Sequence, residues 1–275
     1  MFDLKTLVRP NILALKPYSS ARDEFNGDEG VFLDANENPF GTLNRYPDSY
    51  QKKLKQKLSE YNSINIKNQF IGNGSDEIID LLYRVFCNPT EDKALTFTPT
   101  FGMYQVAADI NAIELIKRPL NEEFQINKDD LKPYLSDDNL KLIFICSPNN
   151  PTGNCFNKAD IEFILKNFNG IVSIDEAYID FSDKKSWSNL LKNYPNLIVT
   201  QTFSKAWGLA AARIGIAYAS DKIIELLNIV KMPYNISQLN EKAAIAALEN
   251  RAAFEANKKI ILEEKEKLIQ ELKTL

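Results

Sequence analysis

The chain carries, at residues 197–219, the sequence LIVTQTFSKAWGLAAARIGIAYA. Its two apolar runs, residues 197–201 and 214–219, have the β-branched composition that is typical of buried strands. The segment between them places Lys205 next to the hydroxyl of Ser204 and puts Arg213 eight positions later. A lone lysine after a strand is usually a solvated side chain, but this combination favours a lysine held in a site at the strand end.

Apolar runs of strand length alternate with helical patterns over most of the chain. Helical spacing first occurs at residues 49–61, after an N-terminal stretch of loop character that ends near Pro47. The pattern then predicts strands at residues 69–72, 93–98, 112–118, 140–146, 170–174, 197–201 and 214–219. Helices are predicted at residues 75–87, 100–111, 157–168 and 221–230, and a nearly continuous one at 241–275. This order predicts an α/β fold with a mostly parallel seven-stranded sheet sandwiched by helices, in which ligands bind at the carboxyl ends of the strands.

The composition excludes several kinds of chemistry. Because the chain has no histidine, a Ser-His-Asp triad and a histidine-ligated metal are both impossible, and we expect no metal site. The three cysteines, Cys87, Cys146 and Cys155, have no CxxC spacing, which indicates a reduced, cytoplasmic setting. A net charge of −4 and the absence of a membrane-spanning apolar run favour small molecules and copies of the chain as partners, with no nucleic acid and no membrane.

Lys205 is the candidate for covalent chemistry. A lysine held in a dry pocket near other cations loses its proton more easily, as an amine that attacks an aldehyde requires. Ser204 and Arg213 could then hold the phosphate of a cofactor, the arginine through a bidentate, charge-assisted pair.

Asp175 ends a predicted buried strand, and Tyr178 follows three residues later. A buried aspartate requires a partner, and the protonated nitrogen of a pyridinium ring would be a suitable one. An Asp-Glu pair after a strand also occurs at metal and nucleotide sites, but the chain has no GxxxxGK[ST] phosphate loop. Glu176 is therefore left without a role.

Two turns supply further candidates. Residues 146–153, CSPNNPTG, form a rigid turn that taken alone favours a structural role, yet it could fix the amide of Asn150 beside a ring oxygen. Residues 71–77, IGNGSDE, lead from a strand into a helix, where the N–H groups of Ser75 and Asp76 could bind a phosphate. Many strand-to-helix turns look like this one. Of the aromatic residues at 101 and 104, one could stack on a planar ring, and we expect Tyr104 to pack in the core.

Taken in this order, the segments resemble fold-type I aminotransferases that use pyridoxal 5′-phosphate, and more closely the histidinol-phosphate aminotransferase family. The stretches LKPYSSAR at 15–22, LDANENPFG at 33–41 and RYP at 45–47 are similar to motifs of that family. The resemblance implies an N-terminal arm at residues 1–30 that contributes to the small domain, and a large cofactor-binding domain at 31–240. It also implies that residues 241–275 form an interdomain helix and the start of an incomplete small domain.

The resemblance also implies roles for individual residues. Lys205 would bond covalently to the cofactor, Asp175 would pair with its ring nitrogen, and Asn150 and Tyr178 would contact its phenolate oxygen. The phosphate would be bound by Ser75, Asp76, Ser204 and Arg213 of the same chain, and by Tyr46 of the partner subunit. The resemblance further implies ring stacking by Phe101, often a tyrosine in relatives, and substrate contacts by Tyr18 and Asn36.

The implied reaction is transfer of an amino group from L-histidinol phosphate to 2-oxoglutarate, in histidine biosynthesis, by a homodimer. An aromatic aminotransferase or a threonine-phosphate decarboxylase would share nearly every residue named. Relatives continue past position 275 into the rest of a small domain, whose arginines bind the substrate. An inactive cofactor-binding fragment is therefore a further alternative, and we expect weak transamination at most.

Overall fold

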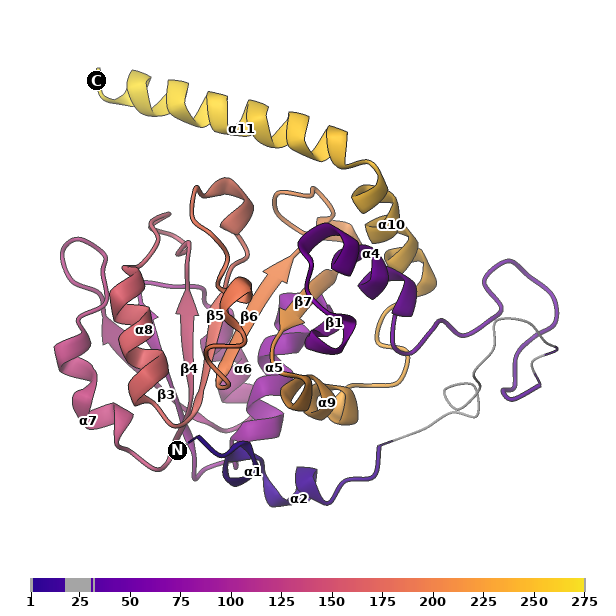
Figure 1. Cartoon of the computed structure of the whole chain (residues 1–275), viewed down its shortest axis with the longest axis horizontal. Helices are drawn as coiled ribbons and strands as arrows, with labels where there is room; N and C mark the ends of the chain where they lie inside the picture. The colour runs from indigo at the N-terminus through magenta and orange to yellow at the C-terminus, as the bar shows by residue number, and fades with distance from the viewer. Residues whose placement is uncertain (1, 18–30, 32, 275) are drawn as a thin grey trace.

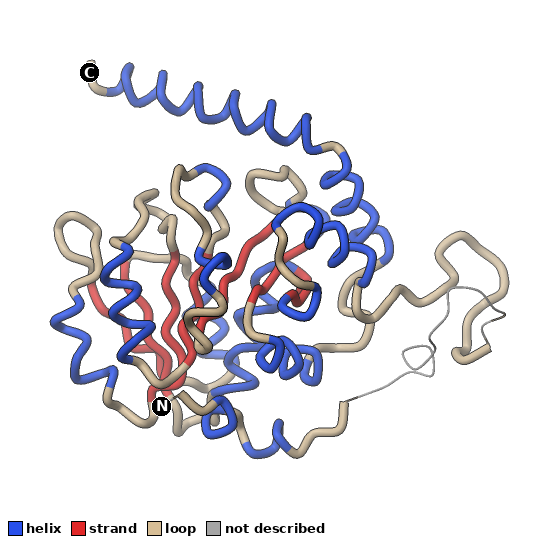
Figure 2. The backbone as a smooth tube through the Cα atoms, viewed as in Figure 1, coloured by secondary structure: helices blue, strands red, loops and turns tan. Residues whose placement is uncertain are grey.

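The computed structural model describes residues 2–17, 31 and 33–274. Within them, seven strands form one sheet in the order β1-β7-β6-β5-β4-β2-β3. Figures 1 and 2 show this sheet with helices packed around it. The strands are β1 (Gln69–Asn73), β2 (Lys93–Thr98), β3 (Glu114–Pro119), β4 (Leu140–Cys146), β5 (Ile171–Asp175), β6 (Leu197–Thr202) and β7 (Ile214–Tyr218). The predicted seven-stranded sheet is therefore confirmed.

Strand direction is uniform except at one position. The pairs β2–β3, β2–β4, β4–β5 and β5–β6 are all parallel. Strand β7 runs antiparallel to both of its neighbours, β1 and β6. The sheet is thus mostly parallel, as predicted, and the last strand in the sequence joins the first strand to the others.

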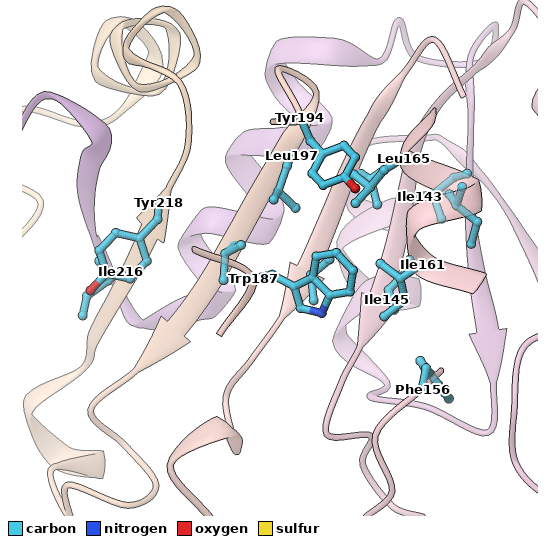
Figure 3. Packing of buried hydrophobic residues seen from close by; sticks show 14 of the residues in the cluster. Ile143, Ile145, Phe156, Ile161, Leu165, Trp187, Tyr194, Leu197, Ile216 and Tyr218 are labelled. Carbon is cyan, nitrogen blue, oxygen red and sulfur yellow. The ribbon is translucent and has the colours of Figure 1, made fainter. Parts of the chain in front are cut away.

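Helices cover both faces of the sheet. One face is packed by α5 (Gly74–Phe86), α6 (Met103–Ile110) and α9 (Asp221–Val230). The other is packed by α4 (Lys52–Asn62), α8 (Lys158–Asn167) and α10 (Gln238–Glu249). Figure 3 shows Ile161 of α8 beside Ile145 of β4 in this second layer. Because successive residues of β4 point to opposite faces, Ile145 joins one hydrophobic cluster and Phe144 the other.

The remaining elements are short. They are α7 (Lys132–Leu135), η1 (Ile66–Asn68), η2 (Lys128–Leu131), η3 (Ile179–Phe181), η4 (Trp187–Leu190) and η5 (Ala210–Ala212). None of the helices in the described ranges combines the length and the apolar character needed to cross a lipid bilayer.

Both ends of the chain differ from the predicted pattern. The N-terminal segment was expected to be loop, but it forms the short helices α1 (Leu4–Leu7) and α2 (Pro10–Leu13). Val8 and Ile12 bury their side chains in the cluster that contains α9, which explains why this segment is ordered. At the other end, the predicted single helix is two: α10 ends at Asn250, where φ is −102° and ψ is 45°, and α11 (Arg251–Leu272) follows.

Helix α11 extends over the carboxyl ends of the strands (Figure 1). Its first turns are held by Phe254, whose ring stacks on Trp207 with the centroids 3.8 Å apart. Since Trp207 lies two residues after Lys205, this contact anchors α11 next to the predicted site.

Candidate active site

Most of the predicted site residues meet at one cavity of about 90 Å³, beyond the carboxyl ends of β4, β5 and β6. Its walls include nine of them: Ser75, Asp76, Phe101, Asn150, Asp175, Tyr178, Ser204, Lys205 and Arg213. Cys146, Ala177 and Thr202 complete the described lining. The topology explains the convergence, because parallel strands deliver the loops that follow them to the same edge of a sheet.

Asp175 lies at the floor of this cavity, as the last residue of β5, and is 4% exposed. Its Oδ2 accepts a hydrogen bond from the hydroxyl of Tyr104 at 2.8 Å, and its Oδ1 accepts one from the backbone N–H of Ala177 at 3.0 Å. Burial raises the pKa of Asp175 above its ordinary value, while these two hydrogen bonds oppose the rise. The site therefore contains a carboxylate that two neutral hydrogen-bond donors hold in place.

The hydrogen bond from Tyr104 was missed by the sequence reasoning, which expected this residue only in the core. It is in the core, with no exposed surface, but its hydroxyl reaches the site. The signal was the i, i+3 spacing from Phe101, which puts both rings on one side of the segment that leads into α6.

Asn150 is presented by a turn that its neighbour holds rigid. The side-chain amide of Asn149, 2% exposed, donates to Pro99 O at 3.0 Å and to Thr152 Oγ1 at 2.8 Å. Its Oδ1 accepts a hydrogen bond from Thr100 Oγ1 at 3.0 Å. Asn149 ties the turn after β4 to the turn after β2, so that Asn150 is free to face the cavity.

The N-terminus of α5 and Arg213 form a compact cradle. The N–H of Gly74 donates to the carbonyl of Arg213 at 2.8 Å, and the guanidinium lies 3.1 Å from the carboxylate of Asp76. Gly74 has φ +77°, and a Cβ there would lie 2.5 Å from Arg213 Nη2. A Cβ on Gly215 would lie 2.4 Å from the backbone nitrogen of Ser75. Both glycines are needed for this close approach, which places free helix N–H groups beside a guanidinium and suits a phosphate.

Lys205 lies on the rim of the cavity. Its Nζ is 5.5 Å from the ring centroid of Tyr178. Among the described residues, no hydrogen bond or ion pair engages this amine. The expectation of a dry pocket is wrong for this chain, since Lys205 is exposed: it belongs to a turn closed by Gly208 N–H and Lys205 O at 3.0 Å, outside the packed strand.

Ser204 and Phe101 complete the walls. The N–H of Ser204 donates to Thr202 Oγ1 at 3.1 Å, and that hydroxyl donates to Ile214 O at 3.1 Å, which ties the lysine segment to β7. The ring of Phe101 meets that of Tyr104 edge to face, with the centroids 5.7 Å apart.

Two predicted residues that the structure describes, Tyr46 and Asn36, do not line this cavity within the chain. Tyr46 is 48% exposed and stacks on Tyr234 with the centroids 4.7 Å apart. It lines a separate groove of about 480 Å³ together with Asn36. Tyr18 lies outside the described residues.

Glu176, which received no role from the sequence, is structural. It is 1% exposed and accepts hydrogen bonds from Trp187 N–H at 2.7 Å and Gln201 Nε2 at 2.9 Å. Burial raises its pKa. Within the described ranges, no group of three or more Asp, Glu or Cys side chains is arranged to hold a metal ion.

Comparison with known proteins identifies similar sequences over nearly the whole chain. A family model described as "Aminotransferase class I and II" matches residues 25–275. A histidinol-phosphate aminotransferase of Christiangramia forsetii is 54% identical over 252 residues, which cover 90% of this chain and 72% of that relative. The histidinol-phosphate aminotransferase of Bacteroides thetaiotaomicron is 50% identical over 277 residues, which cover 100% of this chain and 80% of that relative.

Solved structures share the fold. The histidinol-phosphate aminotransferase from Clostridium acetobutylicum has a TM-score of 0.74 at 26% identity, over 84% of this chain and 69% of that one. The enzyme of the same name from Sinorhizobium meliloti, in complex with pyridoxal-5′-phosphate, has a TM-score of 0.75 at 23% identity, over 82% and 62% of the two chains. The predicted fold type is therefore confirmed.

Proposed function

The chain belongs to the aminotransferase class I and II family, and on this basis we propose that it transfers the amino group of L-histidinol phosphate to 2-oxoglutarate with pyridoxal 5′-phosphate as cofactor. The relatives that are 54% and 50% identical to it carry the name histidinol-phosphate aminotransferase. One observation carries the chemistry: the amine of Lys205, the carboxylate of Asp175 and the guanidinium of Arg213 line one cavity, although they come from separate segments.

The residues at the cavity fit this cofactor. Asp175 is a buried carboxylate that accepts hydrogen bonds from two neutral donors, the Tyr104 hydroxyl and the Ala177 N–H, so a protonated ring nitrogen is a suitable further partner. Gly74 and Gly215, where a Cβ would collide with Arg213 and with the backbone of Ser75, let the guanidinium and the N-terminus of α5 approach each other, which suits a phosphate group there. Lys205 offers an amine that lies 5.5 Å from the centroid of the Tyr178 ring and makes no hydrogen bond or ion pair with the other described residues.

Pyridoxal 5′-phosphate, when bound, supplies an aldehyde that takes up amines and a protonated ring that withdraws electrons from the reacting carbon. Lys205 is the residue whose amine would hold the cofactor covalently through its aldehyde. Its Nζ, when free, would be the base that accepts the proton from the substrate Cα. This base makes a histidine unnecessary, in keeping with a chain that has none.

The other residues bind and orient. Asp175 keeps the proton on the ring nitrogen, and Asn150 and Tyr178 donate hydrogen bonds to the ring oxygen. Arg213 neutralises the phosphate charge through its guanidinium. Together these contacts fix the plane of the cofactor ring relative to Lys205.

The phosphate is bound further by Ser204 and by the N–H groups of Ser75 and Asp76, while Phe101 stacks on the ring. Ser75 and Asp76 lie in the first turn of α5, where the backbone N–H groups have no partner within the helix.

We propose that the enzyme is a homodimer in which the partner subunit's Tyr46 binds the cofactor phosphate. In support, Tyr46 lies outside the Lys205 cavity of its own chain. The segment around it exposes Leu33 at 87% and Phe40 at 83%, and such large apolar side chains favour burial against another subunit. Asn36 lines the same groove as Tyr46. We assign Asn36 and Tyr18 to substrate contact across the same interface.

Two further assignments belong to this proposal. Residues 31–240 form the large cofactor-binding domain, with residues 1–30 as an arm and 241–275 as the interdomain helix and the start of a small domain. The enzyme acts in the cytoplasm, a reducing compartment in which the free thiols of Cys87, Cys146 and Cys155 persist.

The test uses the purified chain mixed with pyridoxal 5′-phosphate. Borohydride reduction should fix the cofactor on the peptide that contains Lys205, and Lys205→Ala should abolish the label while leaving the unfolding transition unchanged. Glutamate formation from 2-oxoglutarate is then measured with each of three amino donors, and the rates are compared. The donors are L-histidinol phosphate, L-phenylalanine and O-phospho-L-threonine. A higher kcat/KM with phenylalanine, or carbon dioxide release from phosphothreonine, would overturn the substrate assignment.

A further inference from the structure

We propose that Tyr104 is a positioning residue for the cofactor: its buried hydroxyl holds the Asp175 carboxylate in place for the ring nitrogen, and its ring supports the stacking residue Phe101. This inference rests on the proposed function and assigns a role to a residue of α6 that does not itself line the cavity.

The geometry links Tyr104 to both sides of the cofactor site. Its hydroxyl donates to Asp175 Oδ2 at 2.8 Å. The edge of its ring meets Phe101 with an interplanar angle of 88°. A single side chain therefore sets the position of the carboxylate at the ring nitrogen and of the aromatic face that covers the ring.

The hydroxyl of Tyr104, and not its ring, indicates a role at the site. Packing alone explains the ring, which stacks on Phe144 with the centroids 5.0 Å apart, and a phenylalanine would serve equally well there. A buried hydroxyl costs free energy unless it is hydrogen-bonded, and here the partner is a carboxylate. Burial and the nearby Asp175 raise the pKa of Tyr104 well above its ordinary value, so the phenol stays protonated and remains a donor.

The charges around Asp175 make this donor important. Burial raises the pKa of Asp175, and the nearby carboxylate of Asp76 raises it further. Opposing these effects are the hydrogen bonds from Tyr104 and Ala177 and the charge of Lys205. Tyr104 and Ala177 support the ionised form of Asp175 through direct hydrogen bonds, whereas Lys205 acts on it through its charge.

Two further titratable groups lie close to this carboxyl. Burial raises the pKa of Cys146, at the end of β4, to about 12, so its thiol is neutral beside Asp175. Glu176 is the next residue, but its carboxylate turns to the opposite side and is held by Ser186, Trp187 and Gln201. Neither group replaces the hydrogen bond of Tyr104.

The test compares Tyr104→Phe with Tyr83→Phe. Tyr83 is also fully buried, and its hydroxyl donates to the backbone carbonyl of Tyr104 at 2.9 Å. Each variant therefore loses one buried hydroxyl and one hydrogen bond in the same cluster, but only Tyr104→Phe removes a donor from Asp175. Urea unfolding of both variants checks that each one folds.

The first readout needs no cofactor. In protein labelled with ¹³C-aspartate, the Asp175 carboxyl signal, assigned with Asp175→Asn, is titrated with pH. Loss of the donor should move its midpoint to higher pH in Tyr104→Phe by about one unit, a tenfold change in proton affinity. Tyr83→Phe should keep the midpoint of the parent protein. An unchanged midpoint in Tyr104→Phe would overturn the proposal, whatever the enzyme does.

The second readout is binding of pyridoxamine 5′-phosphate, which forms no bond to Lys205. The affinity of Tyr104→Phe relative to the parent should fall by about threefold at pH 8.5 and by about tenfold or more at pH 6.5, since protonated Asp175 loses the charge that strengthens its hydrogen bond with the ring N–H. If Tyr104 had only a structural role, Tyr104→Phe would weaken binding of this ligand equally at every pH. That is the result expected for Tyr83→Phe. If the parent protein does not bind this ligand at all, the proposed function fails, and the carboxyl titration still decides the role of Tyr104.

Discussion

The guanidinium of Arg213 lies 3.1 Å from the carboxylate of Asp76, although 137 residues separate them in the chain. The two side chains are 43% and 40% exposed, so their pairing contributes at most about 1 kcal/mol to the fold. We expect this pair to contribute mainly to binding of the cofactor phosphate, because it holds the guanidinium next to the N-terminus of α5.

Arg213→Ala should therefore lower cofactor affinity by about 10- to 100-fold, as loss of a charge-assisted contact with a phosphate predicts, while the free energy of unfolding changes little. Absorbance titration with pyridoxal 5′-phosphate and urea unfolding measure the two effects. Arg84→Ala is the matched control, since Arg84 pairs with Asp80 on the same helix at 2.8 Å but away from the cavity. Equal affinity in the two variants would exclude a phosphate at this cradle.

A methyl group at Gly74 should disturb the same cradle. Gly74→Ala combines a positive φ of +77° with a Cβ 2.5 Å from Arg213 Nη2, and we expect weaker cofactor binding and a loss of about 1–3 kcal/mol in stability. Gly153→Ala separates the two causes, because its φ is +75° but no atom lies within 4 Å of the new Cβ. Titration should show normal affinity for Gly153→Ala; an equal loss in both would mean that backbone strain alone is responsible.

The anchoring of α11 depends on one aromatic contact. Phe254 is 6% exposed and stacks on Trp207, so Phe254→Ala should destabilise the docked helix by about 2–3 kcal/mol. The expected result is faster proteolytic cleavage within α11. Ile260→Ala, on the same helix but with a side chain 57% exposed, should leave the cleavage rate unchanged. Similar rates for Phe254→Ala and the parent chain would show that other contacts hold the helix.

The proposed exchange of Tyr46 between subunits can be tested by mixing two variants. Lys205→Ala cannot bond to the cofactor, and Tyr46→Ala should bind its phosphate about tenfold more weakly. In a mixed dimer, one site combines Lys205 of one chain with Tyr46 of the other and is intact. Co-refolded protein should therefore regain tight, borohydride-fixable cofactor at up to one site per mixed dimer. A monomer in sedimentation, or no regain on mixing, would contradict the exchange.

The sequence predicted the position of strands better than their direction. The bounds of β2 and β4 were predicted to the residue, because their apolar runs are bordered by polar or turn-forming residues. Direction is not encoded in such a run, so the antiparallel placement of β7 could not be derived from composition. The break at Asn250 was missed for a similar reason, since the helical spacing continues on both sides of it.

At the site, residue types that follow strands pointed to most of the nine cavity residues, while the family resemblance was needed to favour a functional role for Asn150 and to single out Phe101. The hydrogen bond from Tyr104 to Asp175 and the support that Asn149 gives to the turn depend on three-dimensional contacts between distant segments. The exposure of Lys205 likewise depends on how the loop leaves the sheet. Tyr46 and Asn36 could not be placed relative to Lys205 from one chain, because they lie in a different groove.

The position of β7 has a consequence for synthesis. Strand β1 pairs with β7 alone, so during translation it has no partner in the sheet until residues 214–218 leave the ribosome. Closing so long a segment is entropically costly and slow compared with the pairing of β4, β5 and β6, which are neighbours in the sequence. We therefore expect the nascent chain to assemble its central strands first, and to acquire the ability to retain a phosphate only in the final step, when β7 docks and brings Arg213 to the N-terminus of α5.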